Sequence, residues 1–174
     1  MKSKTHLLKT ERLELHAISI NDADALIDIL TDSKVAETYM LPKFESREDA
    51  YKCFYRIMSI SHSEKFVYGI YLEGKLIGII NEVYVDGDDI ELGYAISPKH
   101  KGNGYATETL KKAIDALFEM GYVTVIAGAF ENNAASMRVM EKSGMTKCDY
   151  TENVEYNGKT IKCIMYNIKN NPNE

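Results

Sequence analysis

The chain has 174 residues, of which 45% are hydrophobic and 27% charged, a balance typical of a single globular domain, residues 1–174. Its formal net charge of −5 argues against a nucleic-acid partner, which usually requires a basic surface. No apolar run approaches the ~18 residues of a membrane span, and residues 1–10 are too polar for a secretory signal, so we expect a cytoplasmic protein without a membrane partner.

The N-terminal part predicts a strand followed by two helices. Residues 11–18 alternate between apolar and polar side chains, as in a half-buried strand. Asn21 or Asp22 then caps a helix with a continuous apolar face. Residues 35–42 have no regular period and lead into a second helix over residues 48–60.

An antiparallel meander is predicted next. Residues 66–72 and 75–83 are β-prone runs joined by a tight Glu-Gly turn at residues 73–74. An acidic turn at residues 86–89 then reverses the chain into a further strand, residues 90–96.

The glycine-rich sequence KGNGYA, residues 101–106, follows this strand and precedes a helix over residues 107–120. Gly102 and Gly104 allow a tight turn and leave no Cβ between main-chain N–H groups and a bound anion. The free N–H groups of the first helical turn and the helix dipole direct positive charge to the same point. The pattern therefore predicts a binding site for phosphate or pyrophosphate.

Three known glycine-rich motifs could form such a turn, and the residues around the glycines distinguish between them. A P-loop requires Lys and then Ser or Thr after its last glycine, whereas Tyr105 follows Gly104 here. A dinucleotide-binding turn requires a small residue where this chain has Glu108. The remaining pattern is Q/R-x-x-G-x-G/A, with Lys101 where Gln or Arg is usual.

The C-terminal part predicts a second parallel strand, a short helix and a hairpin. Residues 122–129 are mostly β-branched and small, as in a buried strand parallel to the one before the glycine turn. A helix follows over residues 134–142, and residues 145–152 and 160–168 pair around an Asn-Gly turn at residues 157–158.

Two blocks of this sequence together resemble the GNAT superfamily of N-acetyltransferases. One is the glycine turn, and the other is ENNAASMRVMEKSGM, similar to the family segment N-x-A-S-x-R-V-x-E-K-x-G-F. The opening TERLELHAISINDADAL is similar to the ribosomal-protein N-terminal (alanine) acetyltransferase branch. The resemblance implies an α+β fold with a mixed, mostly antiparallel central sheet that splays at a parallel strand pair and is flanked by helices. In the second block it rests on Asn133, Ala135, Ser136, Arg138, Val139, Glu141, Lys142 and Gly144.

The resemblance also implies direct attack of a primary amine on the thioester of acetyl-CoA, with no metal. The pyrophosphate would bind the glycine turn, and the pantetheine would pair with the main chain of the upstream parallel strand, where Gly93 would relax the ladder at a bulge. Asn133 would bond the pantetheine or cap its own helix. The residues expected to hold acetyl-CoA are Tyr94, Ala95, Ile96, Lys101, Gly102, Asn103, Gly104, Tyr105, Ala106, Asn133 and Ser136.

The amine must lose a proton before it attacks, because an ammonium with a pKa near ~10 is unreactive at neutral pH. Glu91 is the first candidate for the base, Glu82 the second and His100 the third, although each carboxylate also fits an ordinary solvated strand position. The leaving thiolate must be protonated. Met140 stands where many family members have a donor tyrosine, so the resemblance assigns the acid to Ser136, whose hydroxyl also suits a bond to the backbone.

The acceptor is a small-molecule amine or a protein N-terminus. Tyr39, Phe44, Tyr51 and Tyr55 are candidates to line its pocket, and each also fits an ordinary aromatic packing position. Exposed sheet edges favour a homodimer. Two alternatives stay open, a non-catalytic CoA-binding sensor and a nucleotide-binding oxidoreductase-like module, and the antiparallel meander argues against the second.

The three cysteines, Cys53, Cys148 and Cys163, are widely spaced. An odd number without a short repeated spacing fits neither a disulfide framework nor a zinc site. We therefore expect buried free thiols.

Overall fold

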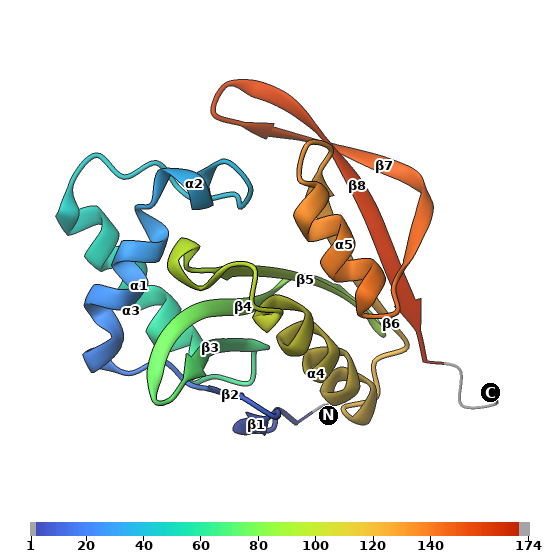
Figure 1. Ribbon diagram of the computed structural model, residues 1–174, viewed down its shortest axis with the longest axis horizontal. Helices are drawn as coiled ribbons and strands as arrows, with labels where there is room; N and C mark the ends of the chain where they lie inside the picture. The colour runs from blue at the N-terminus through green and yellow to red at the C-terminus, as the bar shows by residue number, and fades with distance from the viewer. Residues whose placement is uncertain (1–2, 171–174) are drawn as a thin grey trace.

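The computed structural model describes residues 3–170 and folds them into a mixed eight-stranded sheet with helices on both faces (Figure 1). The strands are β1 (Leu7–Lys9), β2 (Leu13–His16), β3 (Val67–Leu72), β4 (Lys75–Asp86), β5 (Asp89–Ile96), β6 (Thr124–Phe130), β7 (Thr146–Tyr156) and β8 (Lys159–Lys169). Their spatial order is β1-β2-β3-β4-β5-β6-β8-β7, and β5 with β6 is the parallel pair in this otherwise antiparallel sheet. The predicted mostly antiparallel sheet with one parallel pair is therefore confirmed.

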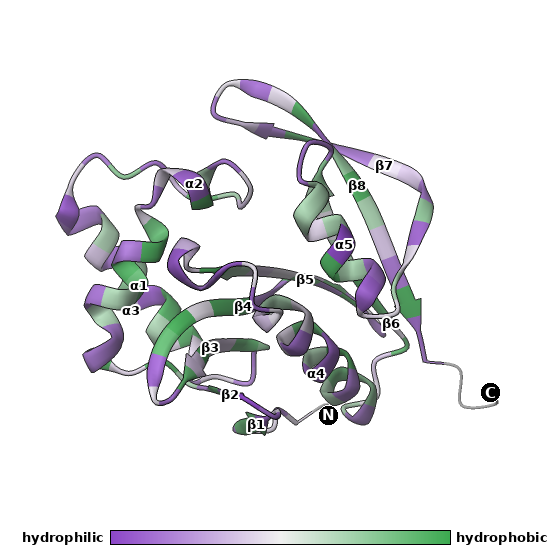
Figure 2. Ribbon diagram, in the orientation of Figure 1, coloured by the Kyte–Doolittle hydropathy of each residue, from purple (hydrophilic) through white to green (hydrophobic). Residues whose placement is uncertain are grey.

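Two apolar layers enclose the middle of the sheet. The helices are α1 (Ala23–Leu30), α2 (Ser33–Ala36), α3 (Arg47–Ser61), α4 (Tyr105–Glu119) and α5 (Ala134–Lys142), with 3-10 turns η1 (Ile20–Asp22) and η2 (Pro98–His100). Leu110, Ile114 and Leu117 of α4 pack on one face, and Leu26 of α1 and Phe54 of α3 pack on the other. Figure 2 shows the central strands as predominantly hydrophobic and the edge strand β7 as hydrophilic.

The parallel pair splays apart, as the sequence predicts. β5 and β6 pair from Asp89 with Thr124 to Leu92 with Ala127. Beyond that point β5 continues along β4 and β6 continues along β8. The two strands thus separate over residues 93–96 and 128–130.

The predicted bulge at Gly93 is wrong in its position. The register shift lies on the neighbouring strand β4 between Glu82 and Tyr84, where Val83 is the extra residue. A Cβ on Gly93 would stand 3.2 Å from Val83 Cγ2 and 3.3 Å from Tyr39 Cε2. The missing side chain at Gly93 therefore makes room for the bulged valine and for a tyrosine ring, while β5 itself stays regular.

Three further elements, α2, α4 and β1, differ from the sequence predictions. Residues 35 and 36, expected to be irregular, belong to α2, which forms because the Asp32 carboxylate accepts hydrogen bonds from the main-chain N–H groups of Lys34 and Val35. Helix α4 begins at Tyr105, two residues earlier than predicted, because Gly104 itself is its N-cap. Strand β1 was missed, since its short span pairs only with β2 and shows little alternation.

The first turn of α4 is tied to the start of β2 by Glu108. Its carboxylate accepts hydrogen bonds from the Thr10 hydroxyl and from the Arg12 main-chain N–H at 2.9 Å, and the Arg12 guanidinium lies 2.7 Å away. The Arg12 guanidinium also stacks on the Tyr105 ring, 4.6 Å from its centroid. Burial raises the pKa of Glu108, but these hydrogen bonds outweigh it and hold the pKa below its usual value.

Within residues 3–170, no helix combines the length and the hydrophobicity that crossing a bilayer would require.

We predict that Glu108→Ala lowers the free energy of unfolding at pH 7 by about 1–3 kcal/mol, because the Thr10 and Arg12 donors lose their acceptor. Urea unfolding measures this, with Glu119→Ala, an exposed carboxylate on the same helix, as the control. A carboxylate with a depressed folded pKa stabilises above its unfolded pKa of ~4.3 and loses that contribution as the pH falls through the folded pKa. The wild-type advantage should therefore shrink below pH ~4.3; an advantage independent of pH would contradict the ionic account.

Candidate functional site

The glycine turn after β5 has the geometry of an anion-binding turn. Gly102 and Gly104 adopt φ angles of 82° and 81°, which other residues rarely adopt. The Asn103 side chain donates hydrogen bonds to the main-chain carbonyls of His100 at 3.1 Å and Lys101 at 3.2 Å, and so closes the turn on itself. Helix α4 begins directly afterwards, so its free N–H groups lie beside the turn.

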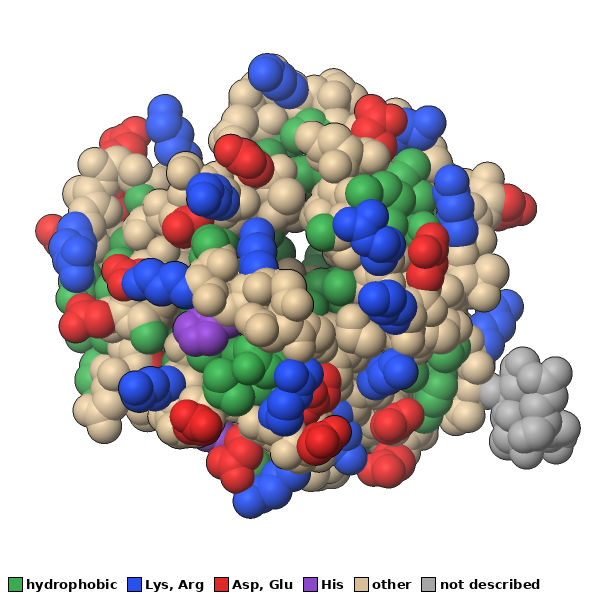
Figure 3. All heavy atoms as spheres, in the orientation of Figure 1, with side chains coloured by type: hydrophobic (Ala, Val, Ile, Leu, Met, Phe, Trp, Pro, Cys, Tyr) green, Lys and Arg blue, Asp and Glu red, His purple; other side chains and the backbone are tan. Residues whose placement is uncertain are grey.

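A cavity of about 450 Å³ extends from this turn into the gap between β5 and β6, and we call it the splay cavity. The glycine turn, residues 93–96 of β5, and α5 form its walls. Figure 3 shows a hollow at the centre of this face with Lys and Arg side chains around it. All the residues predicted to hold acetyl-CoA, except Asn103, line the cavity: Tyr94, Ala95, Ile96, Lys101, Gly102, Gly104, Tyr105, Ala106, Asn133 and Ser136.

The charged lining of the splay cavity is of one sign. Lys101 contributes from the turn, and Arg138 and Lys142 contribute from successive turns of α5, whereas no Asp or Glu among residues 3–170 lines the cavity. His100 also lines it, and its buried Nδ1 has no hydrogen-bond partner in the described part of the chain. Arg138 and Lys142 were not among the residues predicted to bind the cofactor, although their spacing of four puts them on one helix face. The arrangement suits an anionic ligand.

Two hydroxyl groups meet in the wall of the splay cavity. Tyr94 Oη and Ser136 Oγ lie 2.8 Å apart and share a hydrogen bond in which either can donate. Burial raises the pKa of Tyr94 to about 12, and the bond to Ser136 acts in the opposite direction. Asn133 accepts the Ser136 main-chain N–H at 3.1 Å, which is the capping role among its two predicted roles. The sequence analysis assigned only the main chain of Tyr94 and missed its hydroxyl.

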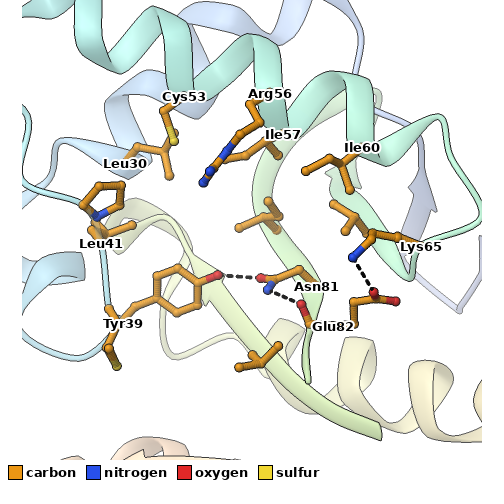
Figure 4. A pocket seen from close by; sticks show the side chains of 15 residues that line it. Leu30, Tyr39, Leu41, Cys53, Arg56, Ile57, Ile60, Lys65, Asn81 and Glu82 are labelled. Carbon is orange, nitrogen blue, oxygen red and sulfur yellow. Dashed lines mark hydrogen bonds and ion pairs between the residues drawn. The ribbon is translucent and has the colours of Figure 1, made fainter. Parts of the chain in front are cut away.

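A second cavity of about 280 Å³ lies against α3, and we call it the α3 cavity (Figure 4). Tyr39 lines both cavities. Its hydroxyl donates a hydrogen bond of 2.5 Å to Asn81 Oδ1, and burial raises its pKa to about 12. The lining of the α3 cavity is Leu30, Tyr39, Met40, Leu41, Pro42, Cys53, Arg56, Ile57, Ile60, Lys65, Val67, Ile79, Asn81, Glu82 and Val83.

The two candidate carboxylate bases have different surroundings. Glu82 lines the α3 cavity, but its Oε2 accepts the Phe66 main-chain N–H at 2.8 Å and its Oε1 lies 3.3 Å from Lys65 Nζ. Glu91 lines neither cavity, and no hydrogen bond or ion pair holds its carboxylate within residues 3–170. Burial, and then the nearby Glu152, raise the pKa of Glu91. Its Oε1 lies 3.9 Å from where a Cβ would stand on Gly128, which lines the splay cavity.

The other predicted acceptor residues do not gather at a cavity. Tyr51 and Tyr55 line neither one. The Tyr51 hydroxyl is directed to Asp24, and Tyr55 is 50% exposed. Their role in acceptor binding stays a prediction, and Tyr39 alone of these three tyrosines lies at the cavities.

No group of three or more His, Cys, Asp or Glu side chains in residues 3–170 is arranged to hold a metal ion. The cysteines at positions 53, 148 and 163 are free thiols, as predicted, but of the three only Cys163 is buried, whereas Cys53 and Cys148 are half-buried.

Comparison with known proteins identifies related chains. Residues 12–146 match the acetyltransferase (GNAT) domain family. The chain is 29% identical over 169 residues to the uncharacterized N-acetyltransferase YoaA of Bacillus subtilis, an alignment that covers 93% of this chain and 96% of YoaA.

Solved structures share the fold. A GNAT-family acetyltransferase from Bacillus anthracis has a TM-score of 0.80 and 25% identity, over 94% of this chain and 98% of that chain. RimL, a ribosomal L7/L12 alpha-N-protein acetyltransferase solved in complex with coenzyme A, has a TM-score of 0.78 and 16% identity, over 94% of this chain and 97% of its own. The expected GNAT fold is confirmed, and its structural neighbours include the ribosomal-protein branch that the N-terminal sequence resembles.

Proposed function

The chain belongs to the acetyltransferase (GNAT) domain family and is an N-acetyltransferase; we propose that its acceptor is a primary amine, either a protein N-terminus or a small amine, which attacks the thioester of acetyl-CoA directly. The observation that carries this proposal is the splay cavity. It begins at an anion-binding turn, has a cationic lining without carboxylates, and adjoins a second cavity at Tyr39.

The splay cavity supports an extended orientation of the cofactor. Its pyrophosphate would lie at residues 101–106, where the first N–H groups of α4 and the side chain of Lys101 supply positive charge. Its pantetheine would lie along residues 93–96, because β5 has no ladder partner there on the β6 side. The thioester would then lie near Tyr39, where the two cavities adjoin.

Adding acetyl-CoA should raise the melting temperature, and NAD should not. Ligand at ~100 times Kd stabilises a protein by about 2.7 kcal/mol, and each kcal/mol raises the melting temperature of a chain of this size by roughly 2–4 °C. Release of free CoA thiol with a panel of amines then tests transfer. A shift without thiol release from any amine would favour the non-catalytic sensor, and a shift with NAD alone would overturn the cofactor assignment.

We further propose Glu91 as the general base, acting through water. Its carboxylate is free of hydrogen bonds in the described residues, whereas both oxygens of Glu82 have partners. A raised pKa makes a carboxylate a better proton acceptor near neutral pH. The negative charge of Glu152, on β7, also contributes to the raised pKa of Glu91.

Glu91→Gln should lower kcat by ~10² or more and leave an acidic limb of the pH–rate profile that is set by the pKa of the amine alone, while Glu82→Gln, the matched control, should change kcat by less than ~10-fold. Glu152→Gln should shift the acidic limb to lower pH, because removing a neighbouring negative charge lowers the pKa of Glu91. The profile of kcat/KM against pH measures both effects. An unchanged kcat in Glu91→Gln at every pH would eliminate this base.

The acid that protonates the leaving thiolate is, in our proposal, Ser136 with Tyr94 behind it. The two hydroxyls form one hydrogen-bonded pair in the cavity wall, so a proton given by Ser136 can be replaced from Tyr94. The thiol of CoA resembles free cysteine, with a pKa of ~8.5, so its thiolate is a good leaving group that a hydrogen bond from Ser136 can stabilise as it forms.

Ser136→Ala should lower kcat by ~10- to 10²-fold with little change in the KM for acetyl-CoA. Tyr94→Phe should lower kcat less, because Ser136 keeps its own proton. Asn133→Ala, which removes the cap of α5, should instead raise the KM for acetyl-CoA. Steady-state kinetics with saturating amine separates the cases, and full turnover in Ser136→Ala would leave water as the acid.

The homodimer expected from the sequence also stays a proposal. The edge strand β7 supports it, because most of its residues are exposed and β8 is its ladder partner on one side. Sedimentation equilibrium would decide between one chain and two.

A further inference from the structure

The α3 cavity contains one cation that its own lining does not neutralise. Its charged residues are Arg56, Lys65 and Glu82. Glu82 and Lys65 pair with each other at 3.3 Å. Within residues 3–170, no carboxylate lies within ion-pair distance of Arg56, and its side chain is exposed. The cavity is thus locally positive in a chain whose net charge is −5.

Arg56 belongs to the cavity by its position on the helix. Cys53, Arg56, Ile57 and Ile60 are spaced as neighbours on one face of α3, and all line the cavity. Figure 4 shows the guanidinium directed from α3 into the cavity. Arg56 also acts on the Cys53 thiol, whose pKa is raised by burial and lowered in part by this guanidinium. An arginine in an otherwise apolar helix face points to an anionic ligand.

Taking the proposed function as its basis, we propose that the acceptor carries a carboxylate as well as its amine, and that Arg56 binds this carboxylate. The planar guanidinium fork matches a carboxylate in two parallel hydrogen bonds. The amine would face Tyr39, because Tyr39 adjoins the splay cavity.

The rest of the lining sets the size and polarity of this acceptor. Ile57, Ile60 and Ile79 are apolar residues of the lining, which favours a hydrocarbon side chain. A volume of about 280 Å³ is small even for a ligand cavity, which typically measures ~300–1,000 Å³. An amino acid with an apolar side chain combines these features. In a protein N-terminus, the α-carboxyl group is part of a neutral peptide bond. Such an acceptor would therefore offer no carboxylate to Arg56.

The test compares leucine, leucinamide and an amidated tetrapeptide that begins with leucine as acceptors, with thiol release as the readout. Leucine should exceed leucinamide by about 10- to 100-fold in kcat/KM, the range expected for a charge-assisted pair. In Arg56→Met this preference should disappear through a raised KM for leucine, while the KM for acetyl-CoA and turnover of leucinamide stay unchanged. Arg56→Lys should restore part of it. Arg47→Met, on the same helix but outside both cavities, is the matched control.

A binding measurement separates this inference from the proposed function. N-acetyl-leucine should raise the melting temperature of the wild type and not that of Arg56→Met, whereas N-acetyl-leucinamide should have little effect on either. Arg56-dependent binding without turnover would uphold the carboxylate site and count against the transfer reaction. Turnover with equal use of leucine and leucinamide, or a preference for the tetrapeptide, would overturn the carboxylate site and uphold acetyl transfer.

Discussion

The end of the parallel ladder between β5 and β6 is the constraint on which the rest of the molecule depends. After Leu92 and Ala127 the two strands no longer pair with each other, and β5 continues to pair with β4 and β6 with β8. A main chain that loses its ladder on one side must find other partners for its N–H and C=O groups. The splay cavity occupies this gap, with the glycine turn at one end and α5 along one wall. The fold therefore supplies an extended, main-chain-lined channel without any dedicated loop.

Both cavities are positively charged, although the chain as a whole is negatively charged. The net charge is −5, yet the splay cavity has Lys101, Arg138 and Lys142 in its lining and no carboxylate. In the α3 cavity, Arg56 has no ion-pair partner within the described part of the chain. Net charge bears on solubility and encounter, whereas recognition depends on which side chains the fold brings together. The acidic composition, which weakly suits a cationic acceptor, is for this reason a poor guide to the acceptor.

Tyr39 joins the two cavities. Its ring lies against Gly93, which has no side chain to displace it, and its hydroxyl is held by Asn81 on β4. A half-buried tyrosine with a raised pKa stays neutral and so forms a wall without adding charge. The bulge at Val83 completes this wall from the neighbouring strand. The place where an amine would meet a thioester is thus built from the segment after α2 and from β4 and β5, which lie far apart in the sequence.

The sequence by itself determined most of the elements and the glycine turn. Local periodicity and turn chemistry predicted the meander, the parallel pair and the Asn-Gly hairpin, and the glycine turn predicted an anion site, because these features depend on neighbouring residues. Tertiary structure alone decided the bulge at Val83, the Tyr94–Ser136 pair and the convergence of Arg56 and Tyr39 on one cavity. Each of these joins residues from different elements, and side-chain identity does not encode which distant groups will meet. For the same reason Tyr51 and Tyr55, equally plausible by residue type, lie outside both cavities.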